Sequence, residues 1–350
     1  MTTHDLRLTT RDSLPHGRVL IIAGSDSGGG AGIQGDIKTV SALGGYAMTA
    51  ITALTAQNTR GVSEIHPVPA DFVAEQIRMC LSDIGADAIK TGMLHSAEVI
   101  ESIVVSLTAC APLPRGEVGF PPHHFSSPPV SNDAQSSQRS GGVGNPGEGG
   151  LTQVVSRPHP KNARIPSPLR SEEPRHFSTS TDGRGAPSRT AVPLIVDPVM
   201  VAKGGAPLLE AAALHALKTK LIPMAALITP NLPEAELLLG RKISADGMED
   251  AARALLDLGC AAVLLKGGHG TGEMLTDVLV TRGEHVLKLT TPRIATRNTH
   301  GTGCAFASAI ATGLAQQLSL ADAVRRAHAY VQAAIARAPG FGAGNGPLGH

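Results

Sequence analysis

The chain has 350 residues, which is enough for two average domains or for one large α/β domain. Lysine and arginine number 30 against 29 for aspartate and glutamate, and this net charge of +1 argues against a nucleic-acid protein led by phosphate neutralisation. Aromatic residues make up only 2% and tryptophan is absent, which argues against a base-stacking surface and predicts an aliphatic core.

Short apolar runs alternate with amphipathic segments over most of the chain. The runs predict strands at 19–23, 47–54, 87–91, 194–198, 226–229 and 262–266, and an antiparallel edge from 277–280 and 285–289. Apolar residues at helical spacing predict helices at 33–43, 71–84, 96–107, 250–258, 303–316 and 320–336. Repeated strand–helix units predict an α/β fold with a mostly parallel sheet, covered by helices on both faces.

One segment departs from this pattern in composition. Residues 111–192 hold 13 of the 25 prolines and 12 serines, without a lasting helical or strand period. They cannot bury enough apolar surface to offset the entropy of ordering, so we expect a low-complexity, disordered insert. It is either an inert loop or a docking segment with Pro-x-x-Pro ligands. Residues 18–110 and 193–340 would then form a single domain, with a disordered tail at 1–17 and a flexible tail at 341–350.

The sequence indicates neither membrane insertion nor secretion. No apolar run approaches the roughly 20 residues of a membrane helix, and residues 1–18 carry Asp5 and Asp12 without an apolar region. The four cysteines are widely spaced and include no Cys-x-x-Cys pair, so neither a disulfide framework nor a zinc site is indicated. We therefore expect a cytoplasmic protein.

A glycine-rich segment, Gly24-Ser-Asp-Ser-Gly-Gly-Gly-Ala-Gly32, follows the first strand and leads into the first helix. Glycines let the backbone approach a ligand closely, and a helix N-terminus favours negative groups. The spacing is not that of a Walker loop, and a flexible turn is the alternative explanation. Asp36, four residues into the helix, is either a functional group or a carboxylate favoured by the helix dipole.

Two further candidates follow predicted strands, at the end where parallel α/β sheets gather ligands. Gln57 comes after strand 47–54, and its primary amide suits the ring nitrogen and amino edge of a heterocycle. Plain turn chemistry is the alternative for Gln57. Met93 follows strand 87–91 and either lines a flat ring or belongs to the core.

Polar residues also follow the strands of the second half. Asn231 and Glu234 share one face of a starting helix, where they either hold Mg²⁺, directly or through water, or form a capping box. Lys266 and Gly268 belong to a glycine-rich turn, which is a reasonable site for nucleotide phosphates or a plain hairpin loop.

The segment Gly301-Thr302-Gly303-Cys304 begins the helix at 303–316 and carries the most weight. Successive backbone N–H groups there form an anion hole for charge that builds on a transferring phosphoryl group. Cys304 lies in the first turn, where a thiol pKa of about 8.5 can fall. It could then accept a proton from a substrate hydroxyl, or it is simply a small buried residue.

Together these segments resemble hydroxymethylpyrimidine/phosphomethylpyrimidine kinase, a branch of the ribokinase-like superfamily. The motifs run in order and cover essentially all of the chain outside the insert and the ends, and none would suffice alone. They are Ala23–Asp36, Ile51–Asn58, Lys90–Leu94, Val196–Met200, Thr229–Glu234, Lys266–His269 and Asn298–Cys304.

The resemblance implies a three-layer α/β/α fold, usually homodimeric. It also implies phosphorylation by ATP and Mg²⁺ of 4-amino-5-hydroxymethyl-2-methylpyrimidine, then of its monophosphate, in thiamine biosynthesis, without a nucleic-acid or membrane partner. By the resemblance, Gln57, Asp36 and Met93 would bind the substrate. The anion hole would consist of Gly301, Thr302 and Gly303, and Cys304 would act as the base. The nucleotide would be bound by Asp197, Asn231, Lys266 and Gly268, and magnesium would be bound by Glu234.

Two other functions compete with this one. Pyridoxal or pyridoxine kinase, of the same superfamily, also acts on an aromatic ring with a hydroxymethyl group, although the Gln57 amide favours a pyrimidine with an exocyclic amino group. A non-catalytic ligand-binding module would show a damaged anion hole or phosphate loop, and both are intact. The insert departs from the family pattern, but it follows a helix at the periphery of the sheet and should not cross the site.

Overall fold

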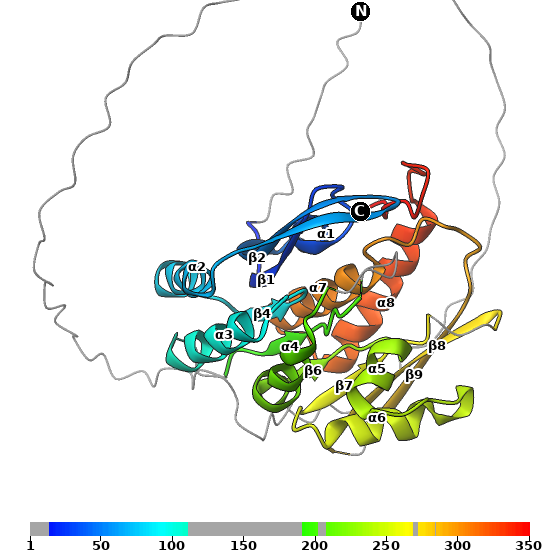
Figure 1. The fold of residues 1–350 in the computed structure, drawn as a ribbon. Coiled ribbons are helices and arrows are strands. Elements are labelled where there is room, and N and C mark those ends of the chain that lie inside the picture. The colour runs from blue at the N-terminus through cyan, green and yellow to red at the C-terminus, as the bar shows by residue number, and fades with distance from the viewer. Residues whose placement is uncertain (1–13, 111–190, 202–207, 269–271, 284) are drawn as a thin grey trace, which may run out of the picture. The chain divides into compact units, whose positions relative to one another are not determined.

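The computed structural model describes residues 14–110, 191–201, 208–268, 272–283 and 285–350. These residues belong to one compact unit built on a nine-stranded sheet (Figure 1). The N-terminal tail and the insert that we expected fall mainly outside the described residues, as does His269 of the Lys266–His269 motif.

Helices and strands alternate along most of the described chain. The strands are β1 (Arg18–Asp26), β2 (Tyr46–Asn58), β3 (Gly61–Pro67), β4 (Ala88–Thr91), β5 (Leu194–Val196), β6 (Leu227–Ile228), β7 (Ala262–Leu265), β8 (Met274–Thr281) and β9 (Val286–Pro292). The α-helices are α1 (Gly32–Ala42), α2 (Ala70–Asp83), α3 (Ala97–Cys110), α4 (Ala211–Ala216), α5 (Leu232–Leu239), α6 (Met248–Leu256), α7 (Thr302–Ala315) and α8 (Leu320–Ala336).

The sheet is parallel at its centre and antiparallel at its edges. The strand order is β3-β2-β1-β4-β5-β6-β7-β8-β9, and the strands from β2 to β7 in this order pair in parallel. Strand β3 at one edge, and β8 and β9 at the other, pair antiparallel. The central strands read as unbroken apolar runs because helices cover both of their faces. This confirms the mostly parallel sheet expected from the sequence.

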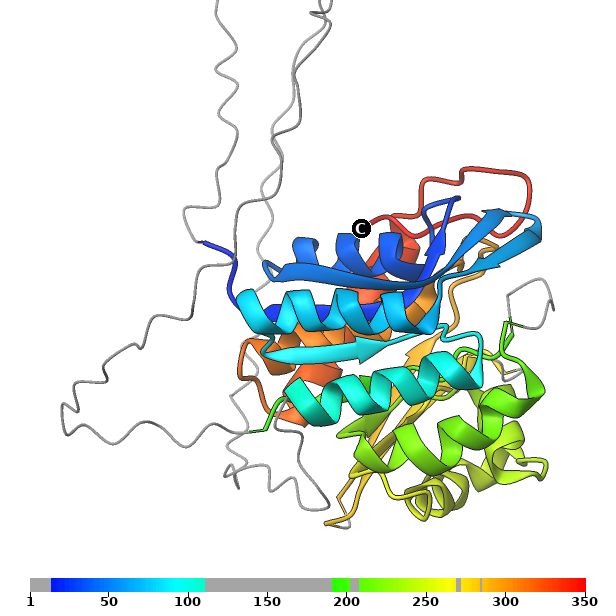
Figure 2. The ribbon, with the colours of Figure 1, turned by 60° about the vertical axis from the view of Figure 1, so that its left-hand side comes forward.

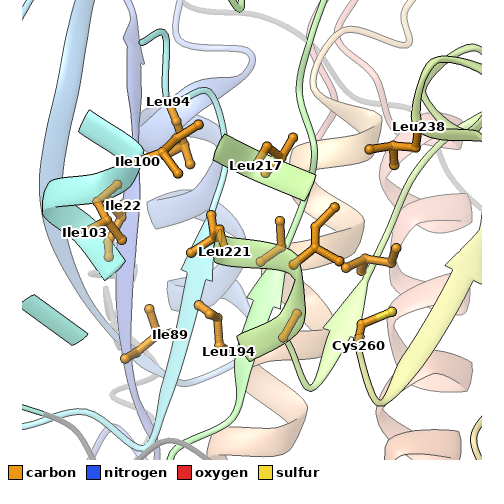
Figure 3. Packing of buried hydrophobic residues seen from close by; sticks show 14 of the residues in the cluster. Ile22, Ile89, Leu94, Ile100, Ile103, Leu194, Leu217, Leu221, Leu238 and Cys260 are labelled. Carbon is orange, nitrogen blue, oxygen red and sulfur yellow. The ribbon is translucent and has the colours of Figure 1, made fainter. Parts of the chain in front are cut away.

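Two aliphatic cores separate the three layers. Alternate residues of β1 enter different cores: Leu20 and Ile22 pack beneath α2 to α6, while Val19 and Ile21 pack against α1, α7 and α8. Figure 2 shows the layers from the side, and Figure 3 shows part of the first core.

None of the helices in the described residues has the length and apolar character needed to cross a membrane.

Three features of the fold differ from the sequence-based expectation. Strand β2 continues to Asn58, so Gln57 lies within a strand, held there by pairing with β3. Strand β3 was not expected because its partly buried apolar residues, Val62 and Ile65, do not alternate regularly in the sequence. Helix α4, which buries Ala213 and Ala216, was also not expected.

The C-terminal residues 341–350, which we expected to form a flexible tail, pack against the domain instead. Leu348 is 4% exposed and belongs to the core beneath α8. The Gly349 amide donates to the Ala334 carbonyl at 3.0 Å, and the Asn345 amide donates to the Thr59 carbonyl at 2.8 Å. Glycines in this segment allow close backbone packing, since a side chain on Gly346 or Gly349 would collide with Asn298 or Arg337.

Candidate active site

A cavity of about 750 Å³ lies at the carboxyl ends of the parallel strands. Asp26 ends β1, Lys90 lies near the end of β4, and Asp197, Asn231 and Lys266 follow β5, β6 and β7. Because parallel strands end at the same edge of the sheet, these side chains from distant parts of the chain meet there. The cavity is lined by all but one of the site residues expected from the sequence, namely Gln57, Met93, Asp197, Asn231, Glu234, Lys266, Gly268, Gly301, Thr302, Gly303 and Cys304.

Asp26 organises the glycine-rich loop between β1 and α1. Its Oδ1 accepts a hydrogen bond from the Gly28 amide at 2.8 Å, and its Oδ2 accepts from the Gly30 and Ala31 amides at 3.1 and 2.8 Å. Burial alone would raise the pKa of Asp26, but hydrogen bonds from His300 and from the loop amides lower it overall. The carboxylate therefore stays charged and holds the loop in one shape.

His300 joins this loop to the predicted substrate amide. Its Nε2 lies 2.8 Å from Asp26 Oδ2 and 3.1 Å from Gln57 Nε2, and its side chain is only 12% exposed. The other end of the amide, Gln57 Oε1, accepts from the Thr55 hydroxyl at 3.3 Å. Because a primary amide has two N–H groups and two acceptor lone pairs, it keeps hydrogen-bonding capacity for a ligand.

The start of α7 lies directly against the glycine-rich loop. Gly301 has a φ of +84°, and a side chain there would collide with the Gly30 carbonyl oxygen, so only glycine fits. Thr302 Oγ1 donates to the Thr299 carbonyl at 2.8 Å, which fixes the turn before the helix. Gly301, Thr302 and Gly303 line the cavity at the start of α7, where the Thr302 amide donates to the Thr299 carbonyl at 3.4 Å.

A buried ion pair lies beside this helix start. Lys266 Nζ is 2.9 Å from Asp197 Oδ1, which also accepts from the Thr229 hydroxyl at 2.9 Å. A Cβ atom on Gly303 would lie 3.1 Å from Lys266 Nζ, so the lysine touches the turn that begins α7. Burial alone would raise the pKa of Asp197, but Lys266 and Lys90 lower it overall, and the carboxylate remains charged.

Asn231 and Glu234 form the capping box that was one of their two explanations. Asn231 Oδ1 accepts from the Glu234 amide at 2.9 Å, and Glu234 Oε2 accepts from the Asn231 amide at 2.8 Å. Burial raises the pKa of Glu234 to about 7, although nearby Lys266 opposes the shift. Both residues also line the cavity, so capping and ligand binding are compatible.

The described residues contain no cluster of three metal-ligating side chains. Two carboxylates at the cavity, those of Asp197 and Glu234, could still hold a metal ion. Their described hydrogen bonds use Oδ1 of Asp197 and Oε2 of Glu234. Their second oxygens, Oδ2 and Oε1, are the atoms that a hydrated divalent cation would contact. Few carboxylates and several waters suit Mg²⁺, so these residues fit that ion.

Asp36 does not line the cavity, in contrast to the substrate-binding role expected from the sequence. It is fully buried, with Oδ2 2.8 Å from Lys90 Nζ and Oδ1 accepting from the Ser308 hydroxyl at 2.7 Å. Burial alone would lower the pKa of Lys90, but Asp36 and its other anionic neighbours raise it overall. Asp36 thus holds a charged lysine, and it is Lys90 that reaches the cavity wall.

Cys304 is a free, partly buried cysteine at the cavity wall. Burial raises the pKa of its thiol to about 12, and Asp36 and Asp197 raise it further while Lys90 opposes them. This direction is opposite to the lowered pKa expected for a cysteine at a helix start. The thiol is therefore neutral in the free protein.

Met93 lies at an apolar part of the same wall. It packs with Ala53 and Leu208 in a small cluster, and its sulfur would touch a Cβ on Gly24 at 3.0 Å. The side chain is 7% exposed, so it serves both the core and the cavity surface.

Sequence reasoning missed Asp26, Lys90 and His300 as site residues. Each lies inside a motif that carries the family resemblance, but the local sequence pattern gives none of the three a role. Lys90 and His300 have partners from other elements, Asp36 and Gln57, and these two pairings appear only in the fold. The loop amides that donate to Asp26, by contrast, lie two to five residues away in the same motif.

Comparison with known proteins identifies the family of the chain. The family model for phosphomethylpyrimidine kinase matches residues 26–113 and 185–349. The thiamine biosynthesis bifunctional protein ThiED of Geobacter sulfurreducens is 42% identical over 99% of this chain, which covers 54% of that relative. The hydroxymethylpyrimidine/phosphomethylpyrimidine kinase of Rhizobium meliloti is 38% identical over 95% of this chain and 96% of its own length.

Two solved structures share the fold. Phosphomethylpyrimidine kinase from Clostridium difficile is 31% identical with a TM-score of 0.60, covering 90% of this chain and 97% of its own. Bacillus subtilis pyridoxal kinase, in complex with ADP, is 26% identical with a TM-score of 0.67, covering 96% and 97%. The three-layer, ribokinase-like fold is thus confirmed. With most of the described chain matched, and its cavity lined by the expected motifs, this protein belongs to the phosphomethylpyrimidine kinase family.

Proposed function

We propose that this kinase transfers phosphoryl groups from ATP to 4-amino-5-hydroxymethyl-2-methylpyrimidine, and then to the resulting monophosphate, in thiamine biosynthesis. The observation that carries the proposal is one cavity with an amide and a thioether at one end and a lysine–aspartate pair at the other, separated by the start of α7. Two relatives that are 38% and 36% identical to this chain are named hydroxymethylpyrimidine/phosphomethylpyrimidine kinase, which supports these two steps.

At the acceptor end, we assign recognition of the pyrimidine to Gln57 and Met93. The amide would bond the ring nitrogen and the exocyclic amino group with the capacity left over from Thr55 and His300. Met93 would pack on the ring face. Asp36 would not touch the ligand; its ion pair with Lys90 would hold that lysine in place at the cavity wall.

At the donor end, Lys266 and Gly268 would contact the ATP phosphates, while Asn231 keeps α5 in place through its capping box. Asp197 and Glu234 are the residues that would hold Mg²⁺, directly or through water. A bound magnesium ion would neutralise phosphate charge. Lys266 can leave its contact with Asp197 for a phosphate because both groups border the cavity.

In the transfer step, the substrate hydroxyl oxygen forms a bond to the γ-phosphorus of ATP as the bond to the β-phosphate oxygen breaks, releasing ADP. The amides of Gly301, Thr302 and Gly303 would stabilise the negative charge on the transferring group. We propose that Cys304 accepts the proton of the substrate hydroxyl, and that it does so in its thiolate form, which is the minor form of the thiol. Because the thiol pKa is about 12, this base contributes at the low end of the usual range, about 10²-fold.

We also propose that the protein is a cytoplasmic homodimer and that residues 111–192 form an insert remote from catalysis. The insert leaves after Cys110, at the end of α3, and the chain returns just before β5. Both points lie at the amino ends of the parallel strands, the edge opposite to the cavity. Replacing residues 112–190 with a short Gly/Ser linker should leave turnover and thermal stability nearly unchanged.

A coupled assay of ADP release tests the function directly. The wild-type protein would receive ATP and Mg²⁺ with the pyrimidine alcohol, its monophosphate or pyridoxal as acceptor. We expect the highest kcat/KM with the two pyrimidines. Higher kcat/KM with pyridoxal would instead support the second candidate, pyridoxal kinase, which the similarity to the Bacillus subtilis enzyme favours.

A further inference from the structure

The last residues of the described chain contact three segments that carry cavity-lining residues. We call residues 343–350 the C-terminal strap; its red trace lies beside the blue β2–β3 hairpin in both views (Figures 1 and 2). The amides of Asn345 and Gly344 donate to the carbonyl and hydroxyl oxygens of Thr59, at 2.8 and 3.2 Å. Thr59 comes two residues after Gln57 in the same hairpin.

The middle of the strap holds the segment before α7. The His300 amide donates to the Gly346 carbonyl at 3.1 Å, and His300 forms a parallel bridge with Pro347. A side chain on Gly346 would collide with Asn298 Oδ1, so this contact leaves no spare room. The strap therefore fixes the backbone of His300, whose ring nitrogen Nε2 lies 2.8 Å from Asp26 Oδ2 and 3.1 Å from Gln57 Nε2.

Pro347 of the strap also packs against the glycine-rich loop. A Cβ on Gly30 would lie 3.2 Å from Pro347 Cβ, which places the proline directly on that loop. The far end is anchored by buried Leu348 and by His350, whose Nδ1 lies 3.0 Å from the Tyr330 hydroxyl. The strap thus ties the hairpin, the segment before α7 and the glycine-rich loop to the core beneath α8.

We propose that the C-terminal strap is a positioning element for the acceptor substrate: it fixes His300 and, through His300, the amide of Gln57. This inference rests on the proposed function in one respect, the assignment of Gln57 to the pyrimidine. The donor end receives no contact from the strap among the hydrogen bonds of the described residues, so the two substrates should respond differently when it is disturbed.

The test compares Gly346→Val, which pushes the strap off Asn298, with Phe341→Ala. Phe341 precedes the strap and is 67% exposed, so its loss should change nothing. We expect Gly346→Val to raise KM for the pyrimidine alcohol about ten-fold, the effect of losing one well-placed hydrogen bond, and KM for ATP less than two-fold. An equal rise in both KM values, or no rise in either, would overturn the proposal.

Amide hydrogen exchange supplies a readout that does not depend on the substrate. Gly346→Val should speed exchange in residues 26–32 and 298–303, and Phe341→Ala should not; unchanged exchange in both variants would contradict the positioning role. If Gly346→Val does not fold, Leu348→Ala, which only weakens the anchor, takes its place with the same criteria. Absence of pyrimidine turnover in the wild-type protein would reject the proposed function, while the exchange data would still decide the role of the strap.

Discussion

Two buried ion pairs contact helix α7, and they differ in how deeply they are buried. In the first, the side chains of Lys90 and Asp36 are both completely buried, although Lys90 borders the cavity wall, and Ser308 of α7 adds a hydrogen bond to the carboxylate. In the second, the side chain of Lys266 is 11% exposed and that of Asp197 is 2% exposed, and both line the cavity. The pairs have nearly the same length, 2.8 and 2.9 Å, so distance alone does not distinguish them.

The difference shows how burial divides structural from functional charge. A sealed pair can change partners only at the full cost of leaving a charge without water, so Lys90 and Asp36 form a fixed support. A pair whose lysine is partly exposed in the cavity can exchange its partner for a ligand or for water. Lys266 and Asp197 therefore suit a site that binds and releases phosphates, whereas the first pair suits its foundation.

Breaking the sealed pair should have the largest effect. Lys90→Met leaves the Asp36 carboxylate buried without a counter-charge, and we expect the free energy of unfolding to fall by about 3–5 kcal/mol. Denaturant unfolding followed by circular dichroism measures this change. The double variant Lys90→Met/Asp36→Leu should recover most of the loss, and equal instability of the single and double variants would show that charge isolation is not the cause.

Breaking the open pair should affect catalysis more than folding. Lys266→Met removes the cation nearest to the start of α7, and we expect kcat/KM for ATP to fall about 10²–10³-fold with a smaller loss of stability than in Lys90→Met. The matched control is Lys242→Met, since Lys242 pairs with Glu236 at 2.7 Å but is 91% exposed. A stability loss as large as that of Lys90→Met would remove the distinction between the two pairs.

The thiol of Cys304, whose pKa is shifted by charged groups of both ion pairs, should control the pH dependence of turnover. The raised pKa of Cys304 means that its thiolate is scarce near pH 7 and increases as the pH rises toward about 12. If the thiolate is the base, kcat should rise between about pH 7 and 9, and Cys304→Ala should lower kcat by about 10²-fold and flatten the profile. Rate measurements at saturating ATP across this range test both points; a wild-type profile without a slope would remove the base role.

A neutral contact at the acceptor end should give the smallest effect. Gln57→Leu removes the amide and leaves the pyrimidine edge unpaired, which costs about 1–3 kcal/mol, so KM for the pyrimidine should rise about ten-fold or more. Stability should change little, because Gln57 belongs to neither ion pair. Steady-state kinetics with the pyrimidine alcohol make the measurement, and an unchanged KM would exclude this contact.

The sequence by itself determined the layered α/β fold and most of the residues at the cavity. Apolar runs that must be covered on both faces predict parallel strands, and glycines or polar residues at strand ends predict where a ligand lies. The positions of Gln57, Lys266 and Gly301 followed from this local pattern, which depends only on chain neighbours, whereas Asp197 was expected only from the family resemblance.

The tertiary structure alone decided which charged groups meet and how they ionise. Asp36 pairs with Lys90, 54 residues away, and His300 reaches Asp26 across 274 residues, so no local spacing reports either contact. The raised pKa of Cys304 depends on burial and on carboxylates from other elements, which outweigh the helix start that the sequence displays. The packing of the strap likewise depends on distant partners. From the sequence alone its glycines predict a flexible tail, whereas in the fold Thr59 and Asn298 lie in close contact with them.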